Sequence, residues 1–99
     1  LVLDEIDTGV SGEIASKIGS ILSEMSKQTQ LIVISHLPQV ASKASTHYKV
    51  EKLDINEKTQ TNIRLLTAEQ RTIELAKMLS GEHVSKAALE NAKALLTNQ

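Results

Sequence analysis

The sequence lacks cysteine, tryptophan and phenylalanine, and its single aromatic residue is Tyr48. Without cysteine the chain has no disulfide framework, no thiolate ligand for zinc and no cysteine nucleophile, and this composition fits a reducing compartment. With one aromatic ring the core must be aliphatic. The chain also offers no platform on which single-stranded nucleic acid could stack several bases.

An excess of one charge and a long apolar run are also lacking. Eleven basic and twelve acidic residues give a net charge of −1, so the sequence does not have the basic surface of an autonomous DNA-binding domain. We interpret its scattered Lys and Arg residues as solvated surface. No apolar run approaches the roughly 18 residues of a membrane span, and no signal-peptide pattern is visible. The chain has 99 residues, 40% of them hydrophobic, which suits one globular domain or part of one.

The first half of the sequence predicts a βαβ unit. Residues 1–3 and 31–34 are two short apolar runs, which is typical of strands covered on both faces in a parallel sheet. A helix capped by Ser11 is predicted between them. Its apolar stripe at the helical period consists of Ile14, Ile18, Ile21, Leu22 and Met25.

The second half predicts a short helix, a hairpin and two further helices. The short helix is expected over residues 37–43. Alternating apolar residues around 48–50 and 63–65 predict an antiparallel hairpin with one buried face and a polar loop over 54–58. A capping box starts the next helix at Thr67, Gly81 ends it, and Ser85 caps a last helix.

Two adjacent carboxylates, Asp4 and Glu5, follow the first predicted strand. They lie at the carboxyl edge of the sheet, where open α/β sheets bind ligands. Successive side chains of a strand point to opposite faces, so one carboxylate can hold Mg²⁺ while the other orients or deprotonates a water. Carboxylates that only end a strand and are solvated there would show the same pattern, so the pair by itself leaves both interpretations open.

His36 follows the second predicted strand, in the equivalent position one βαβ unit later. Parallel strands end at the same edge, so this imidazole can face the same ligand and donate a hydrogen bond to a phosphate oxygen. His47 and His83 have no such position, and we expect them to be surface or core residues.

These features together resemble an ABC-type ATPase head, and more closely the RecN family, bacterial ATPases of DNA double-strand-break repair that are related to the SMC proteins. Residues 1–5 look like a Walker B motif, and His36 falls at the place of the switch histidine. The likeness to RecN rests on four segments and covers essentially the whole chain: Asp4–Gly12, Ser35–Ala41, Glu74–Gly81 and Asn91–Lys93.

The resemblance implies an α/β fold that is part of a P-loop NTPase head of ABC type, with residues 1–99 as its C-terminal portion. It implies that Asp4 helps to hold Mg²⁺ and ATP, that Glu5 polarises the attacking water and that His36 senses the γ-phosphate. Gln39 is expected to contact nucleotide or a partner. Four residues are expected in a loop that faces a second head across an ATP-dependent dimer: Asp7, Gly9, Ser11 and Gly12. Most ABC proteins have Asp at the place of Ser11. The contact that this Asp usually makes across the dimer of heads is therefore not expected here.

The sequence has no G-x-x-x-x-G-K-S/T motif for phosphates and no sustained heptads. Leu79–Glu82 resembles the ABC signature but lacks its second Gly and follows the switch histidine, so we interpret Gly81 as a helix end. By resemblance the missing P-loop, signature and coiled coil lie upstream. We therefore expect this piece alone to be inactive and to bind neither ATP nor Mg²⁺ tightly.

The expected partners are the rest of the same head, a second head, and DNA through the intact protein, with no membrane. The expected location is the bacterial cytoplasm, at the nucleoid. Two alternatives stay open: a head fragment of another SMC-like or ABC ATPase, such as a RecF-like one, and a non-catalytic α/β interaction module with a structural acidic pair.

Overall fold

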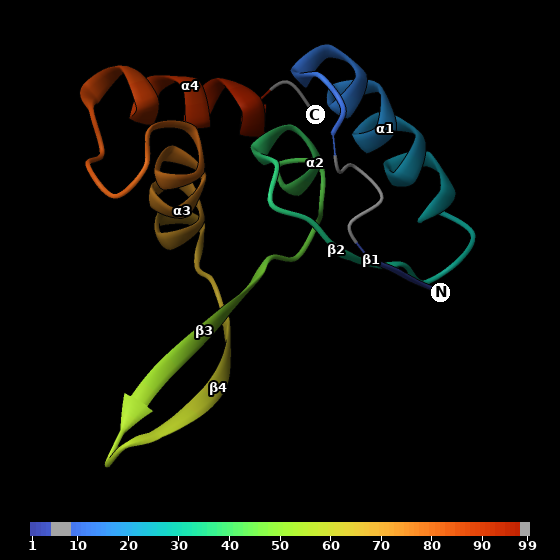
Figure 1. Cartoon of the computed structure of the whole chain (residues 1–99). Coiled ribbons are helices and arrows are strands. Elements are labelled where there is room, and N and C mark those ends of the chain that lie inside the picture. Colours follow the sequence, from blue (N-terminus) through green and yellow to red (C-terminus); the bar gives the residue numbers. More distant parts are fainter. Residues whose placement is uncertain (5–8, 98–99) are drawn as a thin grey trace.

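The structure is a computed structural model that describes residues 1–4 and 9–97. It has two sheets of two strands each: β1 and β2 are parallel, and β3 and β4 form an antiparallel hairpin. The elements in chain order are β1 (Val2–Asp4), α1 (Gly12–Met25), β2 (Ile32–Ile34), α2 (Pro38–Ala41), β3 (Tyr48–Ile55), β4 (Lys58–Leu65), α3 (Ala68–Ser80) and α4 (Lys86–Thr97). The predicted α/β fold, with a βαβ unit followed by a hairpin and C-terminal helices, is confirmed (Figure 1).

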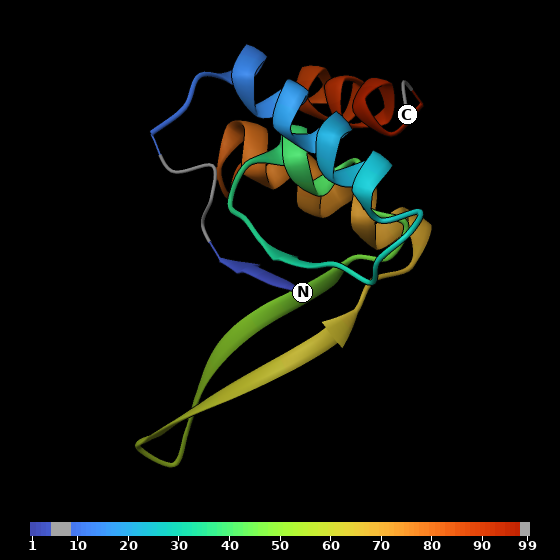
Figure 2. The ribbon, with the colours of Figure 1, turned by 90° about the vertical axis from the view of Figure 1, so that its right-hand side faces the viewer.

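One face of the β1–β2 sheet packs against α1 and α2 (Figure 2). Leu3 pairs with Val33 across the two strands, and both side chains point into this contact. The buried residues of the cluster are small or aliphatic, as the lack of aromatic residues required: Ala15, Leu22 and Val40, with Ile18 and Leu37 partly buried beside them.

The opposite face of this sheet is apolar and exposed. Val2, Ile32 and Ile34 are 61%, 54% and 49% exposed. The prediction that the strands are covered on both faces is therefore wrong for the described residues. Strand alternation turns Leu3 and Val33 towards the helices and the other apolar side chains away from them, and apolar patches of this kind usually mark an interaction surface.

Helix α1 begins as predicted, because the Ser11 hydroxyl accepts a hydrogen bond from the Ile14 amide at 3.4 Å. Its inner face is only partly the predicted apolar stripe. Leu22 is buried, but Ile14 and Ile21 are exposed, and the other buried positions of the helix are Ala15 and Gly19. A Cβ on Gly19 would lie 2.9 Å from the Gln39 carbonyl oxygen, so the two helices approach closely at a residue without a side chain.

The hairpin projects away from the helices (Figure 1) and turns through Asn56 and Glu57, whose φ angles are 51° and 63°. Two consecutive positive φ angles are typical of the tight turns that match strand twist, so the connection is shorter than the predicted polar loop. The predicted buried face is wrong. Its apolar side chains are paired across the strands and are 56–65% exposed: Tyr48 with Leu65, and Val50 with Ile63.

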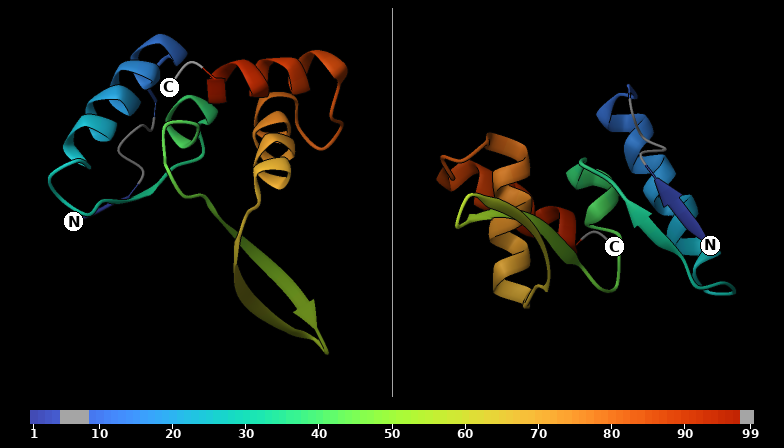
Figure 3. Two further views of the ribbon diagram at one scale, coloured as in Figure 1. Left: turned by 180° about the vertical axis from the view of Figure 1, so that it is seen from behind. Right: turned by 60° about the horizontal axis from the view of Figure 1, so that its bottom comes forward.

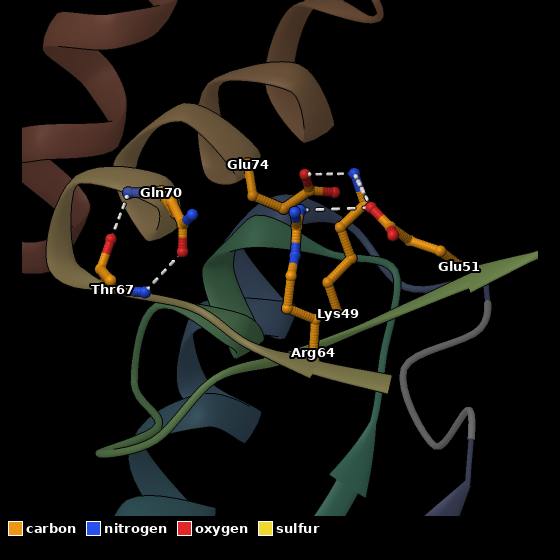
Figure 4. A network of polar contacts seen from close by, with 6 residues as sticks. All are labelled: Lys49, Glu51, Arg64, Thr67, Gln70 and Glu74. Carbon is orange, nitrogen blue, oxygen red and sulfur yellow. Dashed lines mark hydrogen bonds and ion pairs between the residues drawn. The ribbon is translucent and has the colours of Figure 1, made fainter. Parts of the chain in front are cut away.

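Helices α3 and α4 pack against each other, and α2 lies between this pair and α1 (Figure 3). The predicted caps are confirmed. Thr67 and Gln70 form a reciprocal capping box (Figure 4), Gly81 ends α3 with a φ of 82°, and the Ala88 amide donates to the Ser85 hydroxyl at 3.0 Å. The buried core between the two helices consists of Leu75, Ala76, Ala88 and Ala92. Within residues 1–4 and 9–97, no helix has the length and apolarity to cross a bilayer.

Gly19→Ala tests the close approach of α1 and α2. In an unobstructed helix interior, replacing Gly by Ala stabilises by roughly 0.5–1 kcal/mol. Here the added Cβ meets backbone at 2.9 Å, and α2 has to move. We therefore expect the free energy of unfolding to fall by roughly 1–3 kcal/mol, measured by urea denaturation of the chain.

Lys17→Ala, on the exposed side of the same helix, is the matched control and should change stability by less than about 0.5 kcal/mol. A Gly19→Ala chain at least as stable as the wild type would contradict the close approach.

Candidate functional site

The parallel pairing of β1 and β2 brings two of the predicted site segments to one edge of the sheet. Asp4, the last residue of β1, pairs with Ile34, the last residue of β2, and His36 follows two residues later. The side chains of Asp4 and His36 are exposed. Glu5 and Asp7 lie outside the described residues, so their predicted roles stay predictions.

The backbone on either side of His36 is fixed. The Leu37 amide donates a hydrogen bond to the Ser35 hydroxyl at 3.1 Å, which forms a local turn around the histidine. Leu37 packs into the core cluster, and Pro38, which is buried, starts α2. His36 therefore lies exposed on a short segment that is held at both of its ends.

Gln39 connects this segment to the start of α1. A Cβ on Gly12 would lie 3.1 Å from the Gln39 amide nitrogen Nε2, so the amide lies against the first residue of the helix. Gly9 has a φ of 79°, a conformation that favours glycine, and Ser11 caps the helix. Three of the four residues of the predicted dimer-interface loop are thus described, and their loop adjoins α2 through Gln39.

At this edge of the sheet, Asp4 supplies a carboxylate of the kind that suits Mg²⁺. Within the described ranges no group of three or more acidic, His or Cys side chains is placed to hold a metal. Mg²⁺ is commonly bound through one or two carboxylates, with waters and substrate phosphates completing its shell. One exposed carboxylate at a sheet edge fits that mode of binding, in which a substrate phosphate supplies further oxygens.

Sequence reasoning missed a charged network that joins the hairpin to α3 (Figure 4). Lys49 Nζ lies 2.9 Å from a carboxylate oxygen of Glu74 and 3.6 Å from a carboxylate oxygen of Glu51. The guanidinium of Arg64 lies 3.2 Å from the same Glu51 oxygen. The hydrogen bond that the Lys49 ammonium donates to Glu74 raises the pKa of Lys49. The signal was the strand alternation itself, because it puts Lys49, Glu51 and Arg64 on one face of the hairpin.

Arg71 is a further residue that composition alone misassigned, because it is not solvated surface. Its guanidinium Nη2 donates to three backbone carbonyls after the start of α2: those of Ala41 at 3.0 Å, Ser42 at 3.1 Å, and Ala44. Its Nε is buried without a hydrogen-bond partner among the described residues, and so is Nδ1 of His47.

His47 is half-buried beside this guanidinium. Burial lowers the pKa of His47, Arg71 lowers it further, and Glu74 opposes both. The imidazole is therefore held neutral at a place where the hairpin, α3 and the end of α2 meet. It is half-buried and lies away from the edge of the β1–β2 sheet, where the sequence assigned it no role.

Known proteins resemble the chain over nearly its whole length, although no protein-family model matches it. It is 47% identical to the DNA repair protein RecN of Rickettsia conorii, 46% to that of Xylella fastidiosa and 44% to that of Deinococcus radiodurans, each over 96 residues. The alignments cover 97% of this chain but only 17–18% of each relative, so the chain spans less than a fifth of the curated relatives' length. The resemblance stated from the motifs is confirmed.

The burial of His47 predicts a pH-dependent stability. The unfolded chain protonates this imidazole below its usual pKa of 6.5, whereas the folded chain resists protonation. The associated stability is complete above that pH and is lost as the pH falls towards the folded-state pKa. Urea denaturation at about pH 7.5 and about pH 5.5 should show the loss.

His47→Gln should reduce this pH dependence, and His83→Gln, at an exposed histidine, should leave it unchanged. An equal pH dependence in the wild type and in His47→Gln would contradict the assignment.

Proposed function

We propose that this chain, which is RecN-type over nearly its whole length, is the part of an ATP-hydrolysing head that activates water and senses the γ-phosphate. RecN homologues indicate a role in DNA repair, and we propose that the intact protein acts in double-strand-break repair and recombination. One observation carries the ATPase proposal: the end of β1 at Asp4 and the segment with His36 after β2 share a sheet edge. Open α/β sheets bind ligands at this edge.

The proposed chemistry is phosphoryl transfer from ATP to water, in which positioning and electrostatics do most of the catalysis. Bound Mg²⁺ would neutralise charge on the phosphate oxygens. Asp4 would hold the metal, Glu5 would orient or deprotonate the water, and His36 would donate a hydrogen bond to a γ-phosphate oxygen. His36 suits this task because its side chain is exposed while its backbone is held by the turn at Ser35 and by α2.

We further propose that residues 1–99 are the C-terminal portion of the head and that the rest of the head covers their exposed apolar faces. Two such faces support this: Val2, Ile32 and Ile34 on the β1–β2 sheet, and Tyr48, Val50, Ile63 and Leu65 on the hairpin. The curated relatives are more than five times as long as the matched segment, so they have ample chain for such a cover. The phosphate-binding loop, which this sequence lacks, would come from that part.

The loop of Gly9, Ser11 and Gly12, together with Asp7, is proposed to face a second head in an ATP-dependent dimer. Its described residues are exposed, and it adjoins the histidine-bearing segment through Gln39. The intact protein would act at the nucleoid. Other parts of it would bind DNA, because this segment has nearly balanced charge.

Glu5→Gln tests the proposed role of the second carboxylate, in a full-length RecN protein that carries this segment. The amide cannot accept a proton from the attacking water, so we expect hydrolysis to slow by about 10²- to 10⁴-fold while ATP affinity is retained. Steady-state turnover and equilibrium binding of a labelled nucleotide measure the two quantities.

Glu13→Gln removes a carboxylate of the same kind from the exposed first turn of α1 and serves as the control. Normal turnover in Glu5→Gln would remove Glu5 from catalysis.

The proposed cover of the apolar faces predicts that the 99-residue chain alone hydrolyses no ATP, because it has no loop for the phosphates. Co-production with the remaining part of a RecN polypeptide should restore association and Mg²⁺-dependent hydrolysis. Ile32→Lys should weaken the association measured by co-purification, because it would bury an unpaired charge.

Gln60→Lys adds the same charge to an exposed polar position of β4 and should not weaken association. The proposed cover fails if Ile32→Lys associates as well as this control, and robust hydrolysis by the chain alone would contradict the need for the missing part.

A further inference from the structure

Helix α2 depends on its neighbours for its position. It has four residues, Pro38–Ala41, far fewer than the roughly 12–15 that a helix needs to be even marginally stable in isolation. On one side Val40 is buried in the core cluster, and the Gln39 carbonyl lies against Gly19 of α1. These contacts fix the side of α2 that faces α1. At the C-terminal end, Ala41 packs against the α3–α4 cluster, and the Lys43 side chain lies against Gly19.

Arg71 of α3 holds that end. Its Nη2 donates to the carbonyls of Ala41, Ser42 and Ala44, some 30 residues earlier in the chain. The last carbonyls of a helix lack partners within the helix, and a positive charge is favourable beside them. Arg71 is itself fixed, because it lies in the first turns of α3, between the capping box at Thr67 and the buried Leu75.

We propose that Arg71 is a positioning residue for the ATPase site: by holding the C-terminal end of α2, it keeps His36 at the sheet edge and Gln39 against Gly12. His36 lies two residues before α2, and Gln39 lies within it, so a displacement of the helix moves both. This inference rests on the proposed function. It adds that α3, through one guanidinium, sets the geometry of the nucleotide-facing segment and of the loop at the start of α1.

Arg71→Lys in the full-length RecN protein is the first test. Nη2 alone makes the three contacts. Lysine keeps the charge, but its ammonium is one bond nearer the backbone than Nη2, so from the fixed position of α3 it cannot reach the same three carbonyls. We expect kcat for ATP hydrolysis to fall about 3- to 30-fold, with KM for ATP changed by less than about 2-fold. Arg64→Lys is the matched control, because Arg64 contacts Glu51 of the hairpin, away from α2, and it should leave kcat unchanged.

A double-mutant cycle with Gln39→Ala distinguishes positioning from general stabilisation. If Arg71 acts through α2, the loss caused by Arg71→Lys should shrink in the Gln39→Ala background, because the two residues belong to one unit. If the fold-reduction in kcat of the double variant equals the product of the reductions in the two single variants, the proposal is overturned. Gly12→Ala perturbs Gln39 independently of Arg71, because the added Cβ would displace the Gln39 amide. This variant should also lower kcat.

Amide hydrogen exchange of the same proteins gives a readout that does not depend on activity. The amides of Ala41, Ser42 and Lys43 donate to carbonyls within residues 37–40. Arg71→Lys should speed their exchange about 10-fold or more and leave α1 unchanged. Unchanged exchange in α2, or faster exchange with full kcat, would overturn the role of Arg71 and leave the ATPase proposal intact. Normal turnover in Glu5→Gln would instead defeat the ATPase proposal itself.

Discussion

The parallel pairing of β1 with β2 is the constraint on which the rest of the molecule depends. It sets Leu3 beside Val33 on one face, and this small apolar surface is what α1 and α2 pack against. It also makes both strands end at one edge, so that Asp4 and His36 share a side of the sheet although 32 positions separate them in the sequence. The chemistry that we propose requires this shared edge, because Asp4 would hold Mg²⁺ and His36 would donate a hydrogen bond to a γ-phosphate oxygen of the same nucleotide.

The lack of aromatic residues has a structural consequence. The two buried clusters are small and rich in alanine: one joins α1 and α2 to the sheet, and the other joins α3 to α4. Several of the larger aliphatic side chains lie instead on the exposed faces of the β1–β2 sheet and of the hairpin. We propose that these faces contact further protein. The chain matches less than a fifth of the length of its relatives, which leaves ample chain for such a contact.

Local signals made most of the fold predictable. The capping box at Thr67, the glycine at position 81 and the cap at Ser85 act over a few residues, and each one ends or starts a helix as expected. The predictions of burial were wrong where a sequence pattern shows only that a face is apolar. The alternation at Tyr48 and the continuous apolar run at Ile32 each mark such a face, but neither says whether this chain covers it. The contacts of Arg71 were not predictable, because they join segments that only the tertiary fold brings together.

At the candidate site the sequence proposed the residues, and the fold supplied the relation of Asp4 to His36. Asp4 and His36 were both assigned from their positions after apolar strands, and the register confirms that these positions meet at one edge. The contact of Gln39 with Gly12 came from the packing of α2 on α1, which no local pattern encodes.

The most direct test of the central claim is an experimental structure of a full-length RecN protein that carries this segment, with Mg²⁺ and a non-hydrolysable ATP analogue bound. The account predicts Mg²⁺ beside the Asp4 carboxylate and the His36 imidazole within about 2.6–3.2 Å of a γ-phosphate oxygen. A nucleotide bound elsewhere, with this sheet edge open to solvent, would contradict it.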